Sequence, residues 1–206
     1  MSKVKMSKKS TAIDMTAMCD VSFLLLTFFI LTATAKQPEP LAVDTPASTV
    51  KAKLPTEDLA TITIGEGGKV FFQVTGPEVR RRTLELIAEK YNLQFSKDEI
   101  EGFGNMESGF GVPLNKLGSL VKLKSAERSR KEFKLGIPHD SIDNQLKEWV
   151  VASRKANAEI MQKQLNFAIK GDAKEEYPKI KQVMDILQDQ NVNKFNLVTG
   201  LRSKDF

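Results

Sequence analysis

The sequence predicts a single N-terminal transmembrane helix followed by an α+β domain, a mixed sheet with helices on one face. Three observations support this fold class. An apolar run of 19 residues at 17–35 contains one charged residue, Asp20. A proline-rich stretch follows at 36–58, and helix and strand patterns then alternate over residues 59–206, as expected for one compact α+β domain.

Residues 13–35 form the predicted membrane helix. The apolar run is about as long as a helix needs to cross the hydrocarbon core of a bilayer. A cleaved signal peptide, which would make the mature protein secreted and soluble, is the alternative, with "VSFLLLTFFIL" as its apolar stretch and "ATA" at 33–35 as its cleavage site. A carboxylate beside the apolar stretch has no purpose in a removed peptide, so we interpret the segment as an uncleaved anchor.

The charges that flank this helix predict its orientation. Four lysines precede it, at positions 3, 5, 8 and 9, whereas Lys36 alone lies close after it and is followed by Glu39 and Asp44. Positive charge accumulates on the cytoplasmic side of membrane helices. Residues 1–12 are therefore a predicted cytoplasmic basic tail. The rest of the chain after residue 36 is predicted to be periplasmic in a bacterium with two membranes.

A polar stripe runs along one face of the predicted helix. At 100° per residue, six residues fall within an arc of about 80°: Thr16, Asp20, Phe23, Thr27, Leu31 and Thr34. Three of the polar ones, Asp20, Thr27 and Thr34, repeat every seven residues and so lie one above another. Asp14 lies about 120° from Asp20 and is interpreted as an interfacial residue.

Asp20 is the candidate functional residue of this stripe. A carboxylate within the hydrocarbon costs roughly 2.5–3.5 kcal/mol on insertion scales, so it normally faces a partner helix or a water-filled path. A low dielectric favours the neutral carboxyl group, which allows such a residue to take up and release a proton. The alternative is that Asp20 only bonds a polar group of another helix during assembly.

Composition argues against several other functions. The chain has one cysteine, Cys19, and one histidine, His139, so a zinc site or a Cys–His nucleophile is not expected. The net charge of +5 does not form the concentrated basic face that nucleic-acid binding requires. We therefore expect no metal site and no nucleic-acid partner.

Residues 36–58 contain four prolines and predict an extended, semi-rigid linker. After it, "TITI" and "KVFFQV" flank "GEGG" and predict a β-hairpin. A helix is predicted over 77–91, and its Arg80-Arg81-Arg82 run is typical of a solvated helix face, with binding to an anionic surface as the alternative. The segment "EGFGNMESGFGVP" predicts a loop with exposed aromatic side chains.

The C-terminal third predicts helix, strand, helix and strand in turn. An amphipathic helix is expected over 141–161, with Trp149 and Ile160 on its buried face. "LNFAIK" alternates like a half-buried strand. A second helix is expected over 174–190 with Tyr177 facing inward, and "KFNLV" is the closing strand.

The stretch "IDMTAMCDVSFLLLTFFIL" resembles the N-terminal signature of the ExbD/TolR biopolymer-transport proteins, in which Asn/Asp-x-Thr-Pro-x-x-Asp leads into one transmembrane helix. Asp20 falls at the family's membrane aspartate, Asp14 at its Asn/Asp position and Thr16 at its threonine, whereas Ala17 replaces the usual proline. The C-terminal "LNFAIKGDAKEEYPKIKQVMDILQDQNVNKFNLVTGLRS" is similar to the family's closing strand–helix–strand unit. "ATITIGEGGKVFF" resembles its first strand pair less closely, and residues 76–140 look like an insertion.

The resemblance implies a non-enzymatic subunit, without a cofactor, of a proton-motive-force-driven motor of the ExbB–ExbD type in the bacterial inner membrane. Asp20 would be its proton-translocating residue, and we add Thr16, Thr27 and Thr34 as a supporting polar stripe. A homodimer would insert its helices into a ring of a polytopic ExbB/TolQ-like partner and drive a TonB- or TolA-like transducer. The alternatives are a TolR-like subunit of an envelope-maintenance motor and a passively anchored periplasmic binding or scaffold module.

Overall fold

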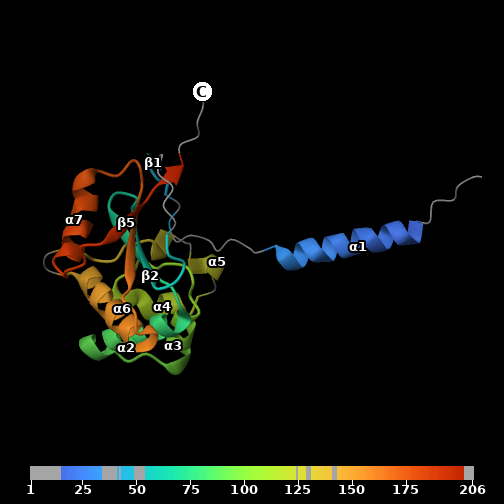
Figure 1. Cartoon of the computed structure of the whole chain (residues 1–206). Coiled ribbons are helices and arrows are strands. Elements are labelled where there is room, and N and C mark those ends of the chain that lie inside the picture. Colours follow the sequence, from blue (N-terminus) through green and yellow to red (C-terminus); the bar gives the residue numbers. More distant parts are fainter. Residues whose placement is uncertain are drawn as a thin grey trace, which may run out of the picture. The chain divides into compact units, whose positions relative to one another are not determined.

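The computed structural model describes residues 15–33, 41, 43–48, 54–123, 125–128, 131–140 and 143–201. It divides into two compact units, residues 1–36 and residues 37–206, which we describe separately. The first unit contains one helix, α1 (Met15–Thr32), within the predicted span of 13–35. The second unit is the folded domain (Figure 1).

A four-stranded mixed sheet forms the centre of the folded domain, with the strand order β3-β2-β4-β5. The strands are β2 (Leu59–Gly65), β3 (Lys69–Val74), β4 (Asn166–Gly171) and β5 (Phe195–Val198). β2 and β3 pair antiparallel, which confirms the predicted hairpin, and β2–β4 and β4–β5 pair parallel. The predicted closing strand is β5.

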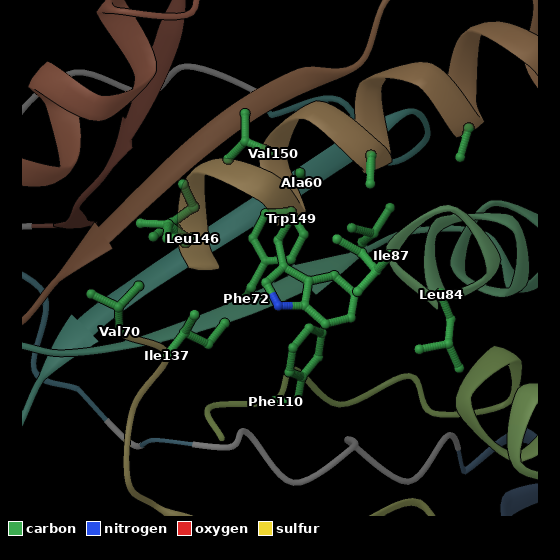
Figure 2. Close-up of a cluster of buried hydrophobic side chains, with 14 of the residues drawn as sticks. Ala60, Val70, Phe72, Leu84, Ile87, Phe110, Ile137, Leu146, Trp149 and Val150 are labelled. Carbon is green, nitrogen blue, oxygen red and sulfur yellow. The ribbon is translucent and has the colours of Figure 1, made fainter. Parts of the chain in front are cut away.

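Three long helices pack on one face of this sheet: α2 (Pro77–Tyr91), α6 (Gln145–Met161) and α7 (Tyr177–Gln188). Alternate strand residues such as Ile62, Phe72 and Phe167 join the apolar sides of the helices in one buried cluster. Trp149 of α6 lies at the centre of the cluster, and its ring centroid is 4.7 Å from that of Phe110 (Figure 2). This packing confirms the prediction of a mixed sheet with helices on one face.

The region interpreted as an insertion, 76–140, is part of the same core. After α2 it contains α3 (Lys97–Gly104), α4 (Leu114–Val121), α5 (Ser125–Arg128) and the 3-10 helix η1 (Lys131–Phe133). The expectation of exposed aromatic residues at 101–113 is wrong, because Phe103 and Phe110 are 2% and 5% exposed. Phe72 and Phe110 exchange backbone hydrogen bonds of 2.8 and 2.9 Å. This segment therefore covers the outer edge of β3.

Part of the predicted linker lies against the folded domain. Leu41 is only 2% exposed. Its side chain lies so close to Gly65 that a Cβ atom added to this glycine would be 2.7 Å from the Cδ2 atom of Leu41. The backbone N–H of Ala173 donates to the carbonyl of Asp44 at 2.7 Å. Residues 47–48 form β1 (Ala47–Ser48), which pairs parallel with β6 (Gly200–Leu201). The chain is thus attached to the domain before its first long strand begins.

Two apolar residues predicted to face inward are exposed instead. Ile160 is 38% exposed because it lies in the last turn of α6, beyond the part that packs on the sheet. Tyr177 is 66% exposed because it is the first residue of α7. Helical periodicity identifies the side of a helix that is buried, but not how far along the helix the burial extends.

Candidate functional site in the membrane helix

α1 carries large apolar side chains all around its circumference, with the polar stripe among them, and none of its side chains is buried within the protein. Of the helices in the described part of the chain, it is the one whose length and composition suit a membrane span. Its large side chains are all at least half exposed, from Leu25 at 53% to Leu31 at 85%. A helix of this kind requires a surrounding apolar environment, which a bilayer or other membrane helices supply.

The helical structure places the predicted stripe on one face. Thr16, Asp20 and Thr27 all lie within α1 and share a side with Phe23 and Leu31. The seven-residue spacing separates Asp20 from Thr27 by about 10.5 Å along the helix axis. Thr34, and also Asp14, lie outside the described residues, so the stripe is described from Thr16 to Leu31.

Three hydroxyl groups of the helix, those of Ser22, Thr27 and Thr32, donate to its own backbone. Thr27 Oγ1 donates to the carbonyl of Leu24 at 2.9 Å, and Thr32 Oγ1 donates to that of Phe28 at 2.7 Å. Ser22 Oγ likewise donates to the carbonyl of Met18 at 2.9 Å. Because each hydroxyl uses its proton locally, its oxygen remains available only as an acceptor. On the Asp20 face, Thr27 therefore offers an acceptor to a water molecule or a neighbouring helix.

Asp20 is exposed, and its carboxylate has no hydrogen-bond or ion-pair partner among the described residues. A charged group in an apolar surrounding is costly unless it is paired or solvated. The partner of Asp20 must therefore come from outside the described chain, as water, as a proton or as another helix. No group of three or more His, Cys, Asp or Glu side chains in the described residues is arranged to hold a metal ion.

The arginine run on α2 was the other candidate for a charged site, and the structure assigns it a structural role. Arg80 is 8% exposed; its Nε donates to the carbonyl of Gly104 and its Nη1 to that of Val74, both at 2.8 Å. Burial lowers the pKa of this guanidinium below its usual value, with Glu107 opposing and Arg81 adding to the shift. Arg80 joins the end of β3 to the end of α3.

The next two arginines form ion pairs within the domain. Arg81 Nη1 lies 2.8 Å and 2.9 Å from the two carboxylate oxygens of Glu101. Arg82 links α2 to α6 through a 2.8 Å bond from its Nε to Glu159, and its hydrogen bonds to Glu159 and Glu85 raise its pKa. The expectation of a solvated face is therefore wrong for Arg80, and anion binding is not supported for any of the three. The spacing of residues along the helix could have predicted this burial. Arg80 lies four and seven residues before Leu84 and Ile87, so it shares a helix face with these two buried residues.

The anchor helix and the sheet domain together define a membrane-anchored α+β protein with one acidic residue in its apolar helix. The chain belongs to the ExbD/TolR family: the family model described as "Biopolymer transport protein ExbD/TolR" matches residues 6–201, nearly the whole chain. No curated protein and no solved structure matches it.

Family membership carries a general assignment. The chain is a non-enzymatic subunit of a biopolymer-transport motor, and the family works in ExbB/TolQ-type complexes with TonB or TolA. The matched range includes Asp20 as well as the elements β4, α7 and β5.

Proposed function

We propose that this chain is the proton-carrying subunit of an ExbB–ExbD-type motor in the bacterial inner membrane, and that Asp20 carries the proton. The observation that supports this most strongly is the position of Asp20. It is an exposed carboxylate without a described partner, and it is the one charged residue of a predominantly apolar helix. An ionisable residue inside a membrane is expected to serve ion passage or to pair with another helix.

The proton motive force acts on such a residue in a direct way. Each elementary charge that crosses the membrane releases about 2.3 kcal/mol per 100 mV. When Asp20 takes up a proton, its side chain becomes neutral and can lie against apolar groups. When it releases the proton, it must face water or a cationic or polar partner. Alternation between these two states changes which neighbouring surface α1 prefers, and this change is the mechanical step.

Thr16, Thr27 and Thr34 are proposed to line the same path as Asp20. Thr16 and Thr27 lie on its face of α1. The hydroxyl of Thr27 donates to the backbone at 2.9 Å, so its oxygen accepts a hydrogen bond from a water molecule on that face. A separation of about 10.5 Å from Asp20 is too long for a direct hydrogen bond. Water molecules would therefore connect these groups.

The proposed assembly is a homodimer whose α1 helices insert into a ring of a polytopic ExbB/TolQ-like partner. The N-terminus is cytoplasmic and the folded domain periplasmic, which follows from the four lysines that precede the helix. The domain passes the work to a TonB-like transducer for outer-membrane transport. In a TolR-like motor the transducer is TolA-like instead, and co-purification of one of the two transducers decides between them.

The test is energised outer-membrane transport in cells that carry Asp20→Asn in place of the natural chain. The variant should reach normal levels in the membrane and still assemble with the polytopic partner, while transport falls to that of a deletion strain. Ser22→Ala is the control, because it removes a polar group on a different face of α1 and should keep transport normal.

Normal transport with Asp20→Asn would overturn the proposal. It would leave a passively anchored periplasmic binding or scaffold module, in which α1 can be replaced by an unrelated membrane helix without loss of activity. Loss of assembly together with loss of transport would assign Asp20 to helix association rather than to proton transfer.

A further inference from the structure

The folded domain carries a groove of about 810 Å³ where α6 and α7 end and β4 and β5 begin. Four cationic side chains line it: Arg154, Lys155, Lys163 and Lys194. Five carboxamide side chains line it as well, and no carboxylate or aromatic residue is among its lining residues. The groove therefore combines positive charge with groups that both donate and accept hydrogen bonds.

Two of the three lysines of the groove, Lys155 and Lys194, are only weakly engaged by the protein itself. Lys194 has no partner among the described residues. Lys155 lies 3.9 Å from Glu159, and Lys163 lies 3.5 Å from Asp58; both lysine side chains are at least 60% exposed. The Lys155–Glu159 pair is long and exposed and contributes little to stability, whereas the Asp58 side chain is only 9% exposed and holds Lys163. The ammonium groups of Lys155 and Lys194 can therefore turn toward a ligand at small cost.

Arg154 has a different role. Its Nη1 donates to the carbonyl of Gln190 at 2.8 Å, so this guanidinium offsets the negative end of α7 and fixes one wall. The loop after α6 supplies another part of the lining, and there the side chain of Asn157 donates to the carbonyl of Lys163 at 3.0 Å. Both helix ends that meet the groove carry partial negative charge. Arg154 offsets the charge at the end of α7, which leaves Lys155 and Lys194 available to a ligand.

Charge on this domain is segregated between two grooves. A second groove, of about 610 Å³, lies beside the C-terminal half of α2 and is lined by Glu85 and Glu89 with no cationic residue. Because the two grooves have opposite charge, the basic one is not a consequence of a uniformly basic surface. It will attract anionic ligands and repel cationic ones.

We propose that the basic groove binds an acidic peptide segment of a protein partner. Lysine ammonium groups pair with carboxylates, and the carboxamides can bond to the amide groups of an extended peptide backbone. Val151, which is 44% exposed in the groove, offers contact to an apolar side chain between the acidic ones. The absence of aromatic lining residues argues against single-stranded nucleic acid, whose bases stack on aromatic side chains.

This inference does not depend on Asp20 or on proton transfer, so its test can fail without affecting the proposed motor. The experiment uses the full chain in a non-ionic detergent and measures fluorescence anisotropy. The probe is a labelled hexapeptide that alternates glutamate and valine. The matched probe has glutamine in place of each glutamate, and a heparin hexasaccharide serves as a competing anion without a peptide backbone.

The main variant is Lys155→Gln/Lys194→Gln, and the matched control is Lys116→Gln/Lys181→Gln. The control removes the same charge from two exposed lysines that lie on α4 and α7 and do not line the groove. Lys194→Gln alone should weaken binding of the glutamate peptide about threefold, and the groove double variant about tenfold. The control double variant should stay within about twofold of the natural chain.

The natural chain should also prefer the glutamate peptide to the glutamine peptide, and added salt should reduce this preference. Equal binding of the two peptides, or equal weakening by both double variants, would overturn the inference. Heparin that binds the groove more tightly than the peptide would likewise overturn it, in favour of an anionic glycan. The thermal unfolding curve of each variant checks that the substitutions have not altered the fold.

Discussion

Two charged residues of this chain, Asp20 and Arg80, have opposite surroundings. Arg80 is buried in the folded domain, and two backbone carbonyls accept hydrogen bonds from its guanidinium at 2.8 Å. Asp20 is exposed on α1, and no described residue pairs with its carboxylate. The domain therefore satisfies its buried charge internally, whereas the membrane helix does not.

This difference separates a structural charge from a functional one. A buried charge with its own acceptors stabilises the arrangement that holds them and has no capacity left for a ligand. A charge without partners in an apolar helix must obtain them from elsewhere, and its state changes when the partner changes. We therefore expect substitutions in the domain to alter stability, and those at Asp20 to alter function.

The largest effect on stability should come from Trp149→Ala. Its indole packs against Phe103 and Phe110 at the centre of the core, and loss of a buried aromatic side chain costs about 3–5 kcal/mol. Urea unfolding followed by circular dichroism measures the change. Leu31→Ala in α1 should leave the unfolding free energy of the domain unchanged, and a large effect there would show that the two units are not independent.

Arg80→Met should have the next largest effect. It leaves the carbonyls of Val74 and Gly104 buried without donors, which costs about 1–3 kcal/mol. Arg82→Met removes the more exposed arginine that is bonded to Glu159 and should cost less than about 1 kcal/mol. If the two substitutions cost the same in urea unfolding, the distinction between a buried charge and a surface charge fails for this helix.

Glu99 is another charged residue that is paired within the folded domain, and its contribution to stability should depend on pH. The pKa of this carboxyl lies below its usual 4.5. The largest cause is the hydrogen bond from the backbone N–H of Ser96, and the second is the hydrogen bond from the Lys122 ammonium group. Because the folded pKa is the lower one, the stabilisation is present above about pH 4.5 and is lost as the pH falls through the folded pKa.

Glu99→Gln should therefore lower the unfolding free energy by about 0.5–1 kcal/mol at pH 7, and this difference should shrink as the pH falls below 4.5 and through the folded pKa. Asp20→Asn is the control and should change neither the stability of the domain nor its pH dependence. A difference that does not shrink at all as the pH falls below 4.5 would contradict the assignment of the Glu99 carboxylate as part of the cap.

The smallest expected effect comes from two threonines of α1. Thr27 and Thr32 both donate to the helix backbone, at 2.9 and 2.7 Å, but only Thr27 lies on the Asp20 face. Hydrogen bonds between membrane helices contribute about 0.6 kcal/mol, which corresponds to about threefold. Thr27→Val should reduce energised transport by about that factor, and Thr32→Val should not. Equal effects would remove Thr27 from the proposed path.

Local patterns predicted the elements of this protein well. The apolar run identified α1, the "GEGG" turn identified the β2–β3 hairpin, and the helix over 77–91 has its predicted ends. These features depend on residues that are close in the sequence. The helical face of Asp20 could be predicted for the same reason, because it depends only on helix geometry.

Features that depend on distant residues were missed. Phe110 was expected in an exposed loop, but it pairs with the edge of β3 and packs on Trp149, which follows 39 positions later. Arg80 was expected on a solvated face, but its acceptors belong to β3 and α3. The basic groove brings together residues of α6, β4 and the loop before β5, which the sequence does not show to be neighbours.

Proton flux through the reconstituted motor tests the central claim most directly. Liposomes that contain this chain and its polytopic membrane partner would be energised by a potassium diffusion potential, and proton uptake would be followed with an internal pH dye. The natural chain should conduct protons, and Asp20→Asn should reduce the flux to that of liposomes with the partner alone, while Thr32→Val conducts normally. Unchanged proton flux in Asp20→Asn would contradict the assignment of Asp20 as the proton carrier.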